Sequence, residues 1–167
     1  PRVALTSFDP REKKVQVPSR EVTCYECGRR SHVPSAALSA NCIHCHAHLN
    51  MTDIELKPGS RRLTVRTLGN VTIAPDAVLS HLSVVCHHLD MGGRASGSFR
   101  CSGTLTISGG TRIEGSVQAA SLVVNKGISV ILTQGAVLQD ATIYGRVSGR
   151  IEASGCVRIC RGGELCG

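Results

Sequence analysis

The chain has 167 residues, of which 41% are hydrophobic but only 2% are aromatic. Aromatic rings supply much of the buried area of an ordinary core, so this core has to be built from aliphatic side chains in a narrow space. That disfavours a helical bundle, a doubly wound enzyme and a base-stacking module. The net charge of +7 contains no long block of like charges, and it permits contact with an acidic surface without requiring one.

The sequence contains no apolar run near the ~18 residues of a membrane-spanning helix and no recognisable secretion signal. We therefore expect a soluble protein, and the absence of a leading methionine before Pro1 predicts a processed or trimmed chain. Residues 1–20 show no sustained period and are predicted to form an extended arm. A short apolar cluster in this arm favours packing on the neighbouring module, with a membrane or partner anchor as the alternative: Val3, Ala4, Leu5 and Phe8.

Two C-x2-C pairs lie 14 residues apart in the next segment, at Cys24, Cys27, Cys42 and Cys45. This is the spacing of a zinc ribbon, in which each pair sits on a tight turn whose backbone N–H groups support the thiolates. Four thiolates leave no open coordination position, so we predict one structural Zn²⁺ per chain. The sequence thus predicts a zinc ribbon over residues 21–56, which is too short to fold on an apolar core alone.

The remaining histidines and cysteines favour structural roles. One imidazole of His44, His46 and His48 is expected to bond a thiolate, and His32 is not needed as a ligand because four cysteines suffice. Cys86 and Cys101 are predicted to line the core. Three cysteines without C-x2-C spacing are predicted at outward or corner positions, as small filler or as exposed reducible thiols: Cys156, Cys160 and Cys166.

Composition changes near residue 60, since 16 of the 18 glycines follow that point. The run Lys57-Pro58-Gly59-Ser60 predicts a linker, and residues 61–167 contain internal repeats with a step of about 17. Short period-2 strands separated by small residues describe an all-β fold, a three-faced parallel, right-handed β-helix of about six coils. Its predicted inward residues are Val71, Ile73, Leu105, Ile107, Leu122, Val124, Val157 and Ile159.

The repeat texture, above all the block LTISGGTRIEGSV at residues 105–117, resembles that of the bactofilins, polymer-forming bacterial cytoskeletal proteins. The resemblance covers roughly residues 61–167, and a zinc-ribbon-like module here precedes the β-helix in place of a short tail. The chain stops within a repeat block, so we expect the rod to continue beyond Gly167. The resemblance implies a non-enzymatic bacterial scaffold in the cytoplasm, with peripheral contact at the inner membrane as a further expectation.

A β-helix ends in unpaired strand edges and uncovered core, so two rods can stack end to end without a nucleotide. The predicted contact residues of such a homopolymer are Leu63 and Val65 at the first coil and Leu165 at the last. The resemblance further implies envelope-associated or chromosome-positioning proteins as partners. The zinc module would then recruit a partner or regulate assembly.

Two other functions compete with this interpretation. Basic residues flank the zinc module and favour nucleic-acid contact through Lys13, Lys14, Arg29 and Arg30, with Arg11 and Arg20 beside them. Glu12, Glu21 and Glu26 in the same stretch, and Tyr25 as the lone stacking ring, weigh against this function. A hexapeptide-repeat acyltransferase also builds a triangular rod, but 17-residue coils break its spacing, and its candidate histidines would be His81, His87 and His88.

Overall fold

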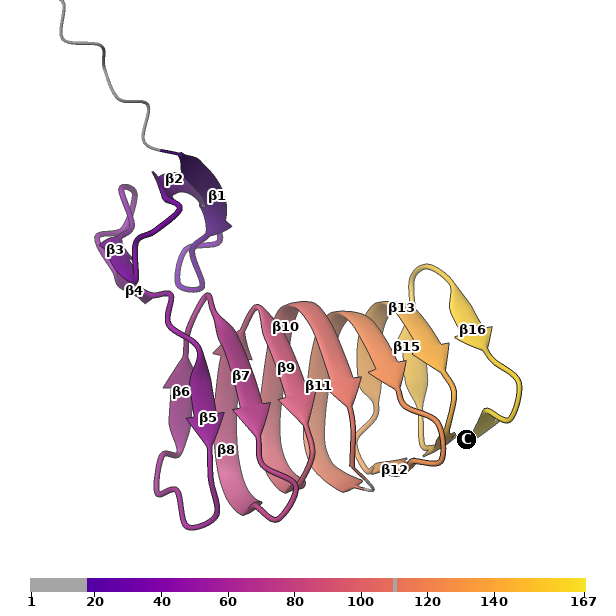
Figure 1. Cartoon of the computed structure of the whole chain (residues 1–167). Coiled ribbons are helices and arrows are strands. Elements are labelled where there is room, and N and C mark those ends of the chain that lie inside the picture. The colour runs from indigo at the N-terminus through magenta and orange to yellow at the C-terminus, as the bar shows by residue number, and fades with distance from the viewer. Residues whose placement is uncertain (1–17, 110) are drawn as a thin grey trace, which may run out of the picture.

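The computed structural model describes residues 18–109 and 111–167, and within these ranges the chain is all-β without a helix. Two antiparallel hairpins come first, β1 (Ser19–Thr23) with β2 (Arg30–Pro34) and β3 (Ser39–Asn41) with β4 (His48–Asn50). The following strands form one 13-stranded sheet of parallel pairs that winds into a solenoid of about six turns (Figure 1). The predicted coiling of the repeats is thus confirmed.

Each coil of the solenoid passes over three faces. Face A contains β5 (Ile54–Leu56), β7 (Asn70–Ile73), β9 (His88–Met91), the last parts of β10 (Arg94–Ile107), β11 (Thr111–Val124) and β13 (Ala136–Ile143), and β16 (Val157–Ile159). Face B contains β6 (Thr64–Arg66), the second part of β8 (Val78–Cys86), the middle of β10 and β11, the start of β13, and β15 (Ile151–Ala153). Face C contains the starts of β8, β10 and β11, then β12 (Ser129–Leu132), β14 (Arg146–Ser148) and β17 (Glu164–Cys166).

The core is a set of aliphatic ladders, as the period-2 pattern predicts. Leu89, Leu105 and Leu122 occupy the same register position on successive coils and are at most 1% exposed. Burial of each such side chain contributes about 1.5–3 kcal/mol. The prediction of inward, buried positions is wrong for Val157 and Ile159. They pair in register with the ladders, but they are 40% and 50% exposed because no described coil covers them.

Glycine is required where the chain turns from face C to face B. Gly97 and Gly115 stack there with φ near +140°, a conformation that side-chain-bearing residues rarely adopt. A Cβ on Gly115 would also lie 1.7 Å from the carbonyl oxygen of Gly97. The close stacking of coils at this corner accounts for the recurring glycines of the repeats.

The solenoid begins earlier than the sequence predicts. Strand β5 pairs in parallel with β7, with Ile54 opposite Val71, so it already belongs to the first coil. Residues 57–60, predicted as an interdomain linker, instead form a turn inside that coil, closed by a bond from the Ser60 N–H to the Lys57 carbonyl (3.1 Å). The predicted boundaries 21–56 and 61–167 therefore shift, and we use the terms cysteine module for residues 18–53 and solenoid for residues 54–167.

The predicted arm shifts as well, because Ser19 and Arg20 already belong to β1; residues 1–17, including the apolar cluster, lie outside the described part of the chain. None of the described residues forms a helix of the length and apolarity needed to cross a membrane. The cysteine module adjoins a corner of the first coil, and β16 lies at the opposite end of the solenoid (Figure 1).

Candidate metal centre and solenoid ends

The structure brings together all four cysteines of the two C-x2-C pairs. Their Sγ atoms lie within 4.8 Å of one another, and the Cys24–Cys45 and Cys27–Cys42 sulfurs are each 3.7 Å apart. Four sulfurs placed tetrahedrally ~2.3 Å from a central zinc ion would be separated by about 3.8 Å. The donor set and its spacing therefore fit one tetrahedral metal ion.

The two turns that carry these cysteines have the same backbone bonding. In each turn the carbonyl of the first cysteine accepts a hydrogen bond from the N–H of the residue four positions later. The N–H of the same cysteine donates to the carbonyl of the residue five positions later. The four bonds, all 2.9 Å, are Gly28 N to Cys24 O, Cys24 N to Arg29 O, His46 N to Cys42 O and Cys42 N to Ala47 O. His46 has φ +60° where the first turn has Gly28 at +70°. The sequence analysis missed this role of His46, although its position after Cys45 matches that of Gly28 after Cys27.

The electrostatics of the cluster favour a cation. Backbone N–H groups of Cys45 and His44 stabilise the thiolate of Cys42 and lower its pKa to about 6. The backbone N–H of Ala47 favours the thiolate of Cys45 too, but partial desolvation of the sulfur and its hydrogen bonds with the neighbouring cysteines outweigh it and raise the pKa of Cys45 to about 12. A divalent cation at the centre would compensate the repulsion among the thiolates.

The cysteine module has little else to hold it together. Its main apolar cluster consists of Cys24, Cys42 and Leu49, with Val22, Tyr25 and Leu68 packed against them, and Val33 and Met51 are buried outside this cluster. Cys27 and Cys45 are exposed. A core of this size does not sustain a fold of this length without a cross-link, so the four-cysteine cluster is the structural centre of the module.

Other residues predicted near the metal site have different contacts. Nε2 of His44 lies 3.2 Å from the carbonyl oxygen of Arg30, and among the described residues no histidine is hydrogen-bonded to a sulfur. Arg30 forms an ion pair with Glu21 (3.6 Å), and both side chains are largely exposed. Lys13 and Lys14 lie outside the described residues, so the predicted nucleic-acid patch is seen only as Arg29 and Arg30.

The N-terminal end of the solenoid is closed over its aliphatic residues. Val65, predicted to lie on an exposed slice of core, is 2% exposed, and Leu56 is 1% exposed. Both side chains belong to the solenoid core. The segment that follows β5 folds back beside it, and residues from both line one hollow: Asn50, Thr52, Ile54–Lys57, Ser60 and Arg62. Lys57 and Glu55 form an ion pair at this end (3.4 Å). Only Leu63 of the two predicted contact residues is exposed, at 60%.

The C-terminal end has the opposite character. Leu165 is 39% exposed, beside the exposed Val157 and Ile159. Strands β16 and β17 pair with β13 and β14 on one side, and their outer edges have no partner strand among the described residues. Cys156 and Cys166 are exposed and Cys160 is partly exposed, in line with their predicted outward or corner positions.

Cys86 and Cys101 line the core as predicted. They are in-register partners on neighbouring coils, both buried, with sulfurs 3.7 Å apart. The hydrogen bond between the two sulfurs and burial raise the pKa of Cys86. The three histidines considered for acyl transfer serve the corners of the coils: His88 Nδ1 accepts the N–H of Thr104, His87 bonds Ser102, and the N–H of His81 bonds Ser96.

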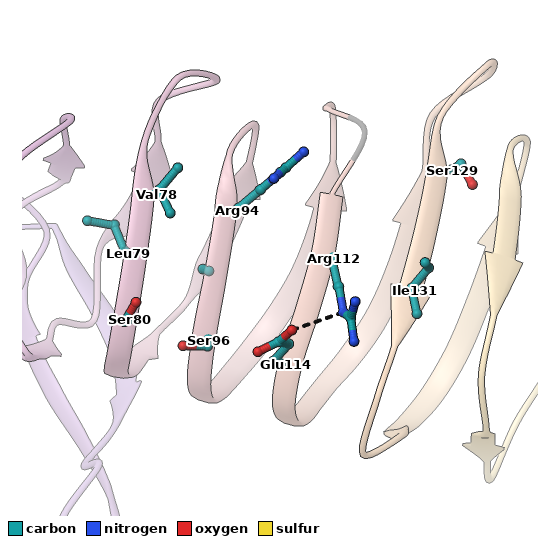
Figure 2. A pocket seen from close by; sticks show the side chains of 10 residues that line it. Val78, Leu79, Ser80, Arg94, Ser96, Arg112, Glu114, Ser129 and Ile131 are labelled. Atoms are coloured by element: carbon teal, nitrogen blue, oxygen red, sulfur yellow. Dashed lines mark ion pairs between the residues drawn. The ribbon is translucent and has the colours of Figure 1, made fainter.

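A shallow hollow of about 560 Å³ crosses face C (Figure 2). Val78, Arg94, Arg112 and Ile131 are register partners on four successive coils, and Arg112 is paired with Glu114 (2.9 Å). Val78 and Ile131 are 70% and 44% exposed. In this view the side chains of Arg94 and Arg112 point in different directions. A scan against protein-family models, a search of curated proteins and a search of solved structures each found no match.

Proposed function

We propose that this protein is a non-enzymatic scaffold that associates with copies of itself end to end through the C-terminal coil of its solenoid. The observation that carries the proposal is the solenoid itself, whose coils stack through parallel strand edges and buried aliphatic ladders, so that one solenoid can continue another. On the last described coil Val157, Ile159 and Leu165 are exposed, whereas Leu56 and Val65 of the first coil are buried. The resemblance of the repeats to those of bactofilins supports a bacterial, cytoplasmic, nucleotide-independent polymer. Envelope-associated or chromosome-positioning proteins are its proposed clients.

A junction of two C-terminal ends would bury the same residues from both copies about a two-fold axis. Each of the three aliphatic side chains is about half exposed, so its burial would contribute roughly 1 kcal/mol. The free edges of β16 and β17 would gain hydrogen-bond partners, each adding about 0.5–1.5 kcal/mol. The N-terminal end, where Leu56 and Val65 are buried, offers no comparable apolar contact.

The cysteine module is proposed to hold one structural Zn²⁺ through Cys24, Cys27, Cys42 and Cys45. The tetrahedral fit of the four sulfurs supports this choice of ion. Elemental analysis of protein purified without chelator should find one zinc per chain, and Cys27→Ser should abolish it. Protein that contains no zinc, or another metal in its place, would refute this part of the proposal.

Sedimentation velocity over a range of concentrations tests the association. The wild-type chain should form dimers or longer particles, and Ile159→Lys should be monomeric because two lysines would face each other across the junction. The matched control is Val137→Lys, which changes an aliphatic residue of similar exposure (51%) on face B, in a strand paired with β11 on one side and β15 on the other, and should associate like the wild type. Circular dichroism has to show that both variants are folded. A folded Ile159→Lys protein that associates as strongly as the wild type would overturn the proposal.

A further inference from the structure

The cysteine module is joined to the first coil through the corner at residues 67–69. Leu68 packs against the module core of Cys24, Cys42 and Leu49, and its backbone N–H donates to the carbonyl of Asn50 (2.7 Å). Two residues of that small core are candidate metal ligands. A solenoid residue thus packs on the small core that contains two candidate metal ligands.

Thr67 ties this corner to both sides. Its side chain is fully buried, and its hydroxyl donates to the carbonyl of Thr52 (2.7 Å) and accepts from the N–H of Gly69 (3.0 Å). Its backbone N–H donates to the carbonyl of Val85 in the second coil (2.8 Å). Thr52 lies at the C-terminal end of the cysteine module. Thr67 therefore connects the module, the first coil and the second coil.

A third contact joins the first metal-binding turn to β6. Glu26 lies between Cys24 and Cys27, and its backbone N–H donates to Cys24 Sγ (3.4 Å). Its carboxylate forms an ion pair with Arg66, which follows Val65 in β6. Displacement of the first turn would therefore remove the partner of Arg66 and the support beneath Leu68 together.

From these contacts we infer that metal binding to the four cysteines controls the N-terminal end of the solenoid, because it holds the corner at residues 66–69 and so keeps the first coil, with Leu56 and Val65, in its closed form. Loss of the metal releases this corner and exposes the two aliphatic residues, so that the closed end becomes a second association surface. The inference rests on the proposed function, since it makes the metal the regulator of how many ends associate. Metal-loaded protein would form dimers through its C-terminal ends, and metal-free protein would form longer chains through both ends.

Hydrogen exchange of the full chain tests the first step, with zinc-loaded protein compared with protein stripped by chelator under a reducing agent. Stripping should speed exchange of residues 54–73 roughly tenfold or more and leave residues 121–148 unchanged. The inference is wrong if residues 54–73 keep their protection while the cysteine module loses its own, or if residues 121–148 lose theirs as well.

Two variants distinguish loss of the Leu68 contact from a general loss of solenoid stability. In zinc-loaded protein, Leu68→Ala should speed exchange of residues 54–73 without changing the zinc content, because it removes the contact and leaves the ligands. Arg100→Gln, which alters an exposed arginine of face B bonded to Gln118, is the control and should leave exchange in that segment unchanged. Equal effects of the two variants would contradict the inference.

The second step is tested in the Ile159→Lys background, where the C-terminal junction is blocked. This variant should be a monomer with zinc and should dimerise after stripping. If it associates with zinc bound, the proposed C-terminal junction fails. If it stays monomeric after stripping, the metal-controlled opening fails instead.

Discussion

The cysteine module and the solenoid are both made of short strands, yet different forces hold their strands together. The module has a core of Cys24, Cys42 and Leu49 around a candidate metal site, whereas the solenoid stacks aliphatic side chains coil upon coil. Its ladders are buried in the middle coils, whereas Val157 and Ile159 of the last described coil are exposed. Stability in the module thus depends on a single point, and in the solenoid it is distributed along the axis.

The largest effect should follow from breaking the metal site. Cys42→Ser removes a buried ligand and, with it, metal binding that contributes ~10–16 kcal/mol apparent in zinc-dependent modules. We expect residues 19–50 to lose hydrogen-exchange protection while residues 121–148 keep theirs. Retention of module structure in the variant would show that the cysteines are not its main source of stability.

A charge in the middle of a ladder should have the next largest effect. Ile107 is fully buried, so Ile107→Lys would leave an unpaired charge in the core at a cost of several kcal/mol and unfold the solenoid. Ile159→Lys, at the same register position on the last coil, should leave the solenoid folded. Circular dichroism of the two variants compares them directly, and equal loss of signal would contradict the difference between middle and end coils.

Glycine substitutions test the stacking of the coils. Gly115→Ala combines φ near +140° with a Cβ 1.7 Å from a carbonyl oxygen, and should cost about 3 kcal/mol or more. Gly127→Ala has φ +76° with open space around the Cβ, and should cost only about 1 kcal/mol. Urea unfolding measures both; similar costs would mean that close stacking is not what selects glycine at position 115.

The smallest effect is expected on the surface. Arg146 and Glu164 are in-register partners joined by an ion pair (2.7 Å), but their side chains are 62% and 55% exposed. Arg146→Gln should lower the free energy of unfolding by less than about 0.5 kcal/mol. If urea unfolding shows a decrease of more than about 1 kcal/mol in the free energy of unfolding, exposed ion pairs contribute more to coil stacking than this account allows.

The sequence was a good guide to whatever repeats or has a fixed spacing. The 17-residue step predicted the ladders of Leu105 and Leu122, and the C-x2-C pairs predicted the cysteine cluster, because both patterns follow from local geometry. Strand β5 was missed since Ile54-Glu55-Leu56 is only three residues long and precedes Pro58-Gly59, which are equally typical of a linker. The burial of Val65 depends on tertiary contacts at the first coil, which local periodicity does not report.

Electron microscopy of the zinc-loaded, associated particle tests the central claim most directly, because the cysteine module marks one end of each solenoid. We predict a straight particle about twice the length of one solenoid, with the C-terminal coils in contact at its centre and a cysteine module at each outer end. A particle whose two cysteine modules meet at the centre, or solenoids that associate side by side, would contradict the account.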